Sequence, residues 1–124
     1  MREIKLTKYA MRVLKPALLS ASGAIKREIE RGISQLFIAD NNKLYIVLRP
    51  ENKTLVVVAA AGSGLYQSQS EIITYARNNG FYQIRFHTKV PERLKKGLTG
   101  LQPELIEIRK KLFNKDEYVF ILRV

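Results

Sequence analysis

The stretch LVVVAAAGSGLYQSQS, residues 55–70, carries the clearest structural signal of the sequence. Its first part, 55–61, is an unbroken apolar run, which is typical of a strand buried on both faces of a sheet. A Gly-Ser-Gly turn at 62–64 ends the run, and a helical pattern follows that continues to Gly80. A strand that turns directly into a helix gathers free backbone N–H groups, and such a cluster favours an anion, above all a phosphate.

The residues before this stretch predict two helices and then a meander of strands. Helical periodicity covers 6–20, where Pro16 kinks or ends the helix, and a second helix over 24–31 is capped by Ser22 and ended by Gly32. Extended patterns then predict strands over 34–39, 43–49 and 54–61, with turns at 40–42 and 50–53. Connections this short favour antiparallel pairing.

The residues after it predict a parallel pair. Ser68 and Glu71 have the spacing of a capping box, which would start the helix that Gly80 closes. A core strand over 81–88 follows, and the strand–helix–strand order makes it a parallel neighbour of 54–61. The remaining predictions are helices over 91–98 and 103–113, a turn over 114–116 and a closing strand over 118–122. Residues 1–124 are therefore expected to form a single α+β domain, with a mixed central sheet and helices on both faces.

Composition excludes several classes of protein. The chain has 124 residues and no cysteine, which rules out disulfides, thiolate catalysis and zinc–thiolate sites. Its longest apolar run is too short to span a bilayer, and residues 1–5 do not resemble a signal peptide, so we expect a cytoplasmic protein without a membrane partner. No metal-ligand cluster, Ser–His–Asp arrangement or Walker-type loop is present, so no metal is expected.

The net charge of +11 suggests polyanionic partners. Four cations recur at spacings of three and four and would share one helix face: Lys5, Lys8, Arg12 and Lys15. Others gather in 89–96 and 109–111, and together they would suit nucleic acid or phage proteins. Few aromatics interleave with these cations, so stacking on bases is not indicated. The charge is equally compatible with solubility alone, and one alternative for the chain is a non-catalytic basic binding protein, such as a virion or assembly component.

Three segments also carry a resemblance to a known family: Val56–Gly64, the helix ending Tyr75-Ala76-Arg77-Asn78-Asn79-Gly80, and the strand Gln83–His87. In these segments and in the order of its elements, the chain resembles the GNAT superfamily of N-acetyltransferases over most of residues 20–124. The strand ending Arg85-Phe86-His87-Thr88 is similar to small GNAT-like proteins of bacteriophages and prophages. The resemblance implies a GNAT-like fold and transfer of an acetyl group from acetyl-CoA to an amine acceptor.

Two features usual in the family are missing. The family's pyrophosphate loop usually reads Gln/Arg-x-x-Gly-x-Gly/Ala, but Ala59 stands three residues before Gly62. The usual tyrosine of the last helix, often the general acid, has no counterpart in 109–113.

The resemblance nevertheless assigns a set of candidate site residues. The cofactor-binding candidates are Ala60, Ala61, Gly62, Ser63, Gly64, Leu65, Tyr66, Gln67 and Ser68, whose amides would hold the pyrophosphate of acyl-CoA. The same glycines would also suit an ordinary strand-to-helix turn.

Acetylation of an amine needs a general base and a general acid. Glu71 and His87 are candidate bases. Tyr118 is a candidate acid, and Tyr45 and Tyr66 are further candidates for that role. Each candidate has a structural alternative: Glu71 as a helix cap, His87 as a solvated or structural residue, and the strand tyrosines as packing residues.

Overall fold

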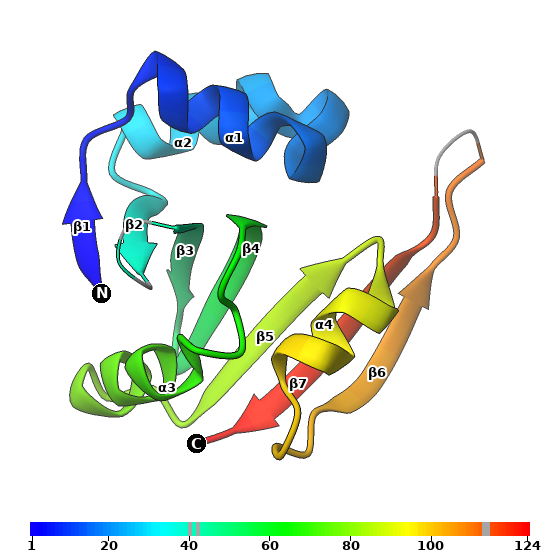
Figure 1. Cartoon of the computed structure of the whole chain (residues 1–124). Helices are drawn as coiled ribbons and strands as arrows, with labels where there is room; N and C mark the ends of the chain where they lie inside the picture. Colours follow the sequence, from blue (N-terminus) through cyan, green and yellow to red (C-terminus); the bar gives the residue numbers. More distant parts are fainter. Residues whose placement is uncertain (40, 42, 113–114) are drawn as a thin grey trace.

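The computed structural model describes residues 1–39, 41, 43–112 and 115–124, and the strands in these ranges form one mixed sheet. The spatial order is β1-β2-β3-β4-β5-β7-β6 (Figure 1). The strands are β1 (Arg2–Ile4), β2 (Gln35–Ala39), β3 (Leu44–Glu51), β4 (Thr54–Gly62), β5 (Gln83–Thr88), β6 (Glu104–Arg109) and β7 (Glu117–Arg123). Among the strands of these described ranges, only β4 and β5 are parallel neighbours. The predicted α+β class, antiparallel meander and βαβ unit are confirmed.

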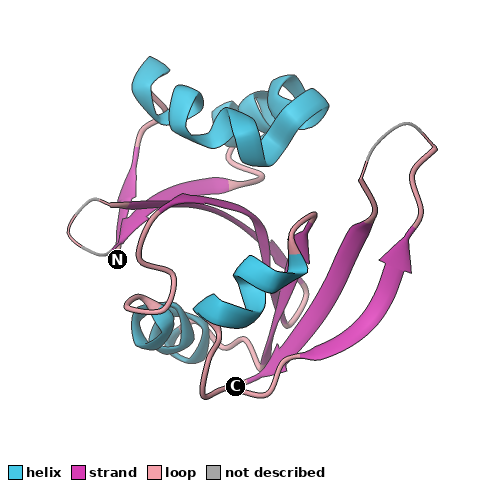
Figure 2. Ribbon diagram, turned by 45° about the vertical axis from the view of Figure 1, so that its right-hand side comes forward, coloured by secondary structure: helices cyan, strands magenta, loops and turns pink. Residues whose placement is uncertain are grey.

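Helices cover both faces of this sheet, as predicted (Figure 2). The helices are α1 (Lys8–Leu18), α2 (Ser22–Glu30), α3 (Gln69–Asn78) and α4 (Pro91–Gly97), and a short 3-10 turn, η1 (Leu19–Ala21), joins the first two. One apolar cluster lies under α1 and α2 against β2, β3 and β4, and the other lies under α3 and α4 on the opposite face. None of the helices in the described ranges is long and apolar enough to cross a membrane.

Helix α1 begins where Thr7 accepts a hydrogen bond from the Ala10 N–H at 3.0 Å. Its buried residues recur every four positions and face the sheet: Ala10, Leu14 and Leu18. Pro16 lies inside the helix, which continues for two more residues before Leu19 adopts a φ of 51°. The proline therefore does not mark the end of the helix.

The predicted cap at Ser22 is wrong, and of the predicted capping box only the position of Ser68 is confirmed. Ser22 is the first residue of α2, and its N–H donates to the Leu19 carbonyl and continues the preceding 3-10 turn. Ser68 is the N-cap residue of α3, but its side chain makes no capping bond. Its N–H donates to the Gly64 carbonyl at 3.0 Å, so Glu71 cannot receive it; Glu71 instead lies 2.8 Å from the amino group of Met1.

The helix predicted over 103–113 is also wrong, because residues 104–109 form strand β6. The apolar spacing of this segment suits a helix, but the free edge of β7 offers it backbone hydrogen bonds, and Ile106 and Ile108 are β-branched. Arg109 pairs with Glu107 at 3.1 Å on its own strand and with Glu117 at 3.3 Å across the strands. Phe113 and Asn114, together with Asp40 and Asn42 of an earlier predicted turn, lie outside the described residues.

Candidate functional site

Strands β4 and β5 separate in the middle of the sheet. They pair only between Thr54–Val57 and Gln83–Phe86, and beyond these residues β4 keeps β3 as its partner while β5 keeps β7. The split coincides with a bulge at Val58, where the register of β4 against β3 slips by one residue. Figure 1 shows the two strands diverging above this point. The last part of β4 therefore has one edge without a strand partner among the described residues.

The turn that leaves β4 requires glycine at Gly62. This residue has a φ of 106°, which strains any L side chain, and a Cβ on it would run into the backbone carbonyl oxygen of Lys43. The next N–H, that of Ser63, donates to the same carbonyl at 3.0 Å. The first glycine thus serves the geometry of the turn, and the amide of Ser63 is already bonded.

The following amides form the cluster that the sequence indicates. The N–H of Ser68 is bonded to the Gly64 carbonyl, but the four N–H groups of residues 64–67 find no acceptor in the described part of the chain. Helix α3 starts immediately afterwards at Gln69, so the positive end of its dipole lies beside these groups. The hydroxyl of Ser68 is fully buried and has no partner among the described residues.

Helix α4 holds this loop in place. Gly97 is buried against the Leu65 side chain so closely that a Cβ would collide with it. Gln69 reaches across from α3 and donates to the carbonyls of Gly97 at 2.7 Å and Thr99 at 3.0 Å. The same last turn of α4 carries two exposed cations, Lys95 and Lys96. The loop is therefore anchored and lies close to positive charge.

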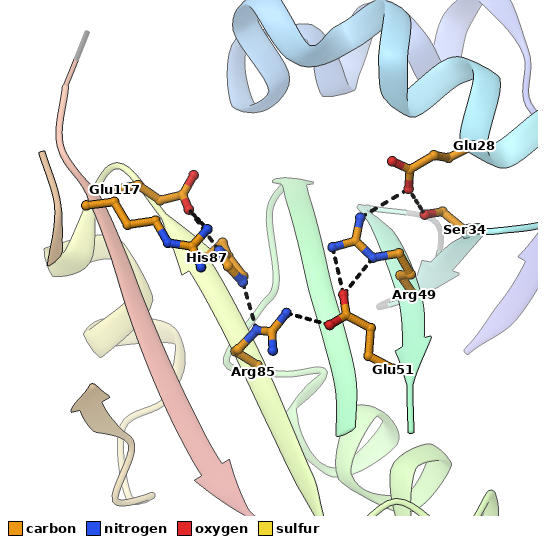
Figure 3. Close-up of polar contacts among 8 residues, drawn as sticks. Glu28, Ser34, Arg49, Glu51, Arg85, His87 and Glu117 are labelled. Carbon is orange, nitrogen blue, oxygen red and sulfur yellow. Dashed lines mark hydrogen bonds and ion pairs between the residues drawn. The ribbon is translucent and has the colours of Figure 1, made fainter. Parts of the chain in front are cut away.

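The other face of the sheet carries a chain of polar contacts beside α1 and α2 (Figure 3). In order, its members are Ser34, Glu28, Arg49, Glu51, Arg85, His87, Glu117 and Arg109. Glu51 lies near its middle and accepts from Arg49 and Arg85, each at 2.9 Å. Each arginine of this chain of contacts has a carboxylate neighbour, and each carboxylate has an arginine neighbour.

His87 has a defined tautomer within this chain. Its Nε2 lies 3.0 Å from Nε of Arg85, and a guanidinium can only donate, so Nε2 must be the acceptor. The ring proton of the neutral imidazole therefore belongs to Nδ1, which donates to Oε1 of Glu117 at 2.9 Å. His87 is the first residue of β5 beyond the last pair with β4. The oriented imidazole thus lies at the opening between the strands.

Two carboxylates near this histidine, Glu117 beside it and Glu51 beyond Arg85, are held ionised. Burial acts to raise the pKa of Glu117, but the hydrogen bond from His87 and the charges of Arg109 and Lys111 outweigh it and lower the pKa. Burial likewise opposes the hydrogen bonds from Arg85 and Arg49 at Glu51, and its pKa is again lowered. Both groups can accept hydrogen bonds at neutral pH, and neither is suited to donate a proton there.

The three candidate catalytic residues do not converge. His87 lies on the sheet face with the polar chain, whereas Glu71 is on α3 and Tyr118 packs against the apolar cluster of the opposite face. Among the other tyrosines, Tyr45 packs edge-to-face against Tyr9 with ring centroids 6.2 Å apart, and Tyr66 is 56% exposed on the loop. In the described ranges, no three His, Asp or Glu side chains come close enough to hold a metal ion.

Sequence reasoning missed Glu117 and gave no role to Arg85 or Glu51. A usable signal was present in polar residues two apart in Arg85-x-His87, on the predicted strand 81–88, and in Arg49-x-Glu51, which crosses the end of the predicted strand 43–49. Such pairs place two polar groups on the same face of a sheet.

Comparison with known proteins identifies the fold. No protein-family model and no curated protein sequence matches the chain. Among solved structures, an acetyltransferase from Bacillus subtilis in complex with CoA is 16% identical, with a TM-score of 0.71 over 99% of this chain and 97% of that one. A Desulfovibrio desulfuricans protein assigned to the GNAT family of acetyltransferases is 15% identical, with a TM-score of 0.65 over 98% and 96%.

A third structure is a Salmonella typhimurium protein assigned as an acetyltransferase, with its cofactor acetyl-CoA. It is 14% identical, with a TM-score of 0.59 over 93% of this chain and 83% of that one. Identities this low carry no residue roles across, but the superpositions extend over nearly the whole chain. The chain therefore has the fold of the GNAT acetyltransferases.

Proposed function

We propose that this protein binds acetyl-CoA and transfers its acetyl group to an amine. The observation that carries the proposal is the position of the four free N–H groups of residues 64–67, between the diverging end of β4 and the start of α3. Proteins of the same fold have been crystallised with CoA and with acetyl-CoA. This loop gives an anionic cofactor of that kind a place to bind.

The residues of the loop fit the cofactor. The free N–H groups and the buried hydroxyl of Ser68 would hold the pyrophosphate, and Lys95 and Lys96 would supply positive charge near a loop that lacks the family's usual Gln or Arg. The small side chains of Ala60 and Ala61 leave the unpaired edge of β4 accessible to the pantetheine arm. Acetyl-CoA would supply an acetyl group activated as a thioester.

His87 would act as the general base for the amine. Glu117 keeps the ring proton on Nδ1 and leaves the Nε2 lone pair to accept a proton from the incoming ammonium group. Arg85 caps that lone pair and must move aside, and Glu51 provides a second anchor for its guanidinium when it does. Glu71 and Tyr118 have no part in this proposal, since they lie on the opposite face of the sheet.

Thermal denaturation with acetyl-CoA tests the binding step. A ligand that binds the folded state raises Tm, so 1 mM acetyl-CoA should stabilise the protein. Tyr66→Glu places a carboxylate on the loop and should abolish the shift. Tyr82→Glu is the matched control, because Tyr82 is equally exposed, at 58%, and lies before β5 at the opposite end of the sheet. The absence of a shift, or an equal loss in both variants, would refute the cofactor site.

Release of free CoA thiol in the presence of a panel of small primary amines tests the chemistry. Removing a general base costs about 10²-fold or more in rate, so His87→Gln should lower turnover by that factor while the Tm shift with acetyl-CoA persists. A His87→Gln variant with the wild-type rate would remove His87 from the mechanism and leave the binding step intact.

A further inference from the structure

A cavity of about 940 Å³ lies away from the opening between β4 and β5, at the other edge of the sheet. It is bounded by the segment joining β1 to α1, by one side of α1 and of α2, and by the start of β2. We call it the α1/α2 groove. Its volume is in the range of binding sites in proteins, and none of the residues of the proposed acetyl-CoA site lines it.

The floor of the groove is apolar. It contains the partly or fully buried side chains of Ile4, Leu6, Met11, Ile29 and Leu36. These residues come from the four elements β1, α1, α2 and β2 and from the linker, so apolar side chains from every part of the groove contribute to its floor. An occupant that presents apolar side chains would gain free energy by covering it.

The rim of the groove is cationic and unpaired. Its five exposed cations are Lys5, Lys8, Arg12, Lys15 and Lys26, against the two carboxylates Glu3 and Glu30. None of these five cations forms an ion pair or a side-chain hydrogen bond within the described residues. This differs from the polar chain across β3 and β5, where Arg49 and Arg85 each contact a carboxylate at close range. Like charges left together repel one another, and an anionic partner would relieve the repulsion.

We propose that the α1/α2 groove binds an acidic amphipathic helix of a partner protein. Sides of α1 and α2 line the groove above an apolar floor, an arrangement that suits the docking of an amphipathic helix. Such a helix is recognised through apolar residues spaced three and four apart. A helix about 10 Å across occupies about 400–500 Å³ per turn, so the cavity volume of about 940 Å³ equals that of about two turns. A nucleic acid is the less suitable occupant, because no aromatic side chain lines the groove for bases to stack on.

Fluorescence anisotropy with a labelled 15-residue peptide tests the proposal. The probe carries Leu at i, i+3, i+4 and i+7 and Glu at most other positions. We expect saturable binding with a micromolar Kd that weakens as salt is raised. Arg12→Glu with Lys15→Glu should weaken binding at least tenfold. The matched control reverses two exposed cations elsewhere, Lys53→Glu with Arg77→Glu, and should bind as the wild type does.

Other outcomes overturn the proposal. If the control variant loses as much peptide affinity as the groove variant, only net charge matters. If a peptide with Ser in place of Leu binds as tightly as the probe, the apolar floor is not used. If single-stranded DNA displaces the probe when its phosphate concentration equals the carboxylate concentration of the peptide, the groove is a general polyanion site. Circular dichroism establishes whether each variant folds. If the α1 variant with Arg12→Glu and Lys15→Glu does not fold, Lys26→Glu on α2 repeats the test. Tyr66→Glu should leave peptide binding unchanged, which separates this result from the cofactor experiment.

Discussion

Replacing Glu51 with Gln should destabilise the protein in a way that depends on pH. The carboxylate accepts from Arg49 and Arg85, each at 2.9 Å, and an amide can keep only one of these two partners. A hydrogen bond between charged groups contributes about 1.5–3 kcal/mol when shielded. Glu51 is 38% exposed, so solvent screening reduces the expected loss to about 1 kcal/mol. For a chain of this size, that corresponds to a decrease in Tm of about 3–5 °C at pH 7.

The sign of the pH effect follows from the pKa of Glu51. Folding lowers this pKa, so the carboxylate contributes stability above its ordinary value of 4.5, and the contribution is lost as pH falls through the lowered, folded-state pKa. The difference in Tm between wild type and variant should therefore be largest at pH 7 and should be smaller at pH 3. Glu104→Gln, at an exposed carboxylate of β6 that has no ion pair among the described residues, is the control. The reasoning would be refuted if Glu51→Gln had the wild-type Tm at pH 7, or if its Tm were lowered by the same amount at pH 3 as at pH 7.

Three further predictions concern the loop, the first helix and the histidine. Gly97→Ala forces a Cβ into the Leu65 side chain, so Tm should fall by the equivalent of about 1–3 kcal/mol. The increase in Tm caused by acetyl-CoA should also become smaller. An unchanged Tm would contradict the contact between Gly97 and Leu65. Pro16→Ala restores an N–H for the Arg12 carbonyl and should raise Tm by the equivalent of about 1–2 kcal/mol in a circular dichroism melt, whereas a lower Tm would count against the helix as described. His87 is the only histidine, so ¹⁵N NMR of its ring is unambiguous; it should carry its proton on Nδ1 at neutral pH, and a proton on Nε2 instead would exclude the contacts described for the ring.

Local sequence patterns predicted the centre of the sheet correctly. The apolar run of β4 indicated a strand buried on both faces, and residues 55–57 and 59 are indeed buried between the two apolar clusters. The glycine turn and the helix after it placed β4 and β5 side by side and parallel. Such features depend on residues close together in the chain, whose backbone preferences and periodicity act before any distant contact forms.

The capping and edge-strand predictions failed where a distant or competing contact prevailed. The apolar spacing of 103–113 suits a helix, yet β7 presents an open edge, and Glu117 provides a partner for Arg109. Glu71 has the right position to close a capping box, but the Ser68 N–H is already bonded to Gly64. A local preference worth a fraction of a kcal/mol is readily overridden by backbone pairing along a whole strand.

The sequence alone determined a buried parallel strand pair, a glycine turn into a helix and a strongly basic surface. Only the tertiary structure decided that β4 and β5 separate after Val57, that Glu117 meets His87 from 30 residues away, and that the cations of α1 border an apolar groove. These features join residues that become neighbours only when the sheet order is complete. Their contacts depend on which strands and helices pack together, and no short stretch of sequence contains that information.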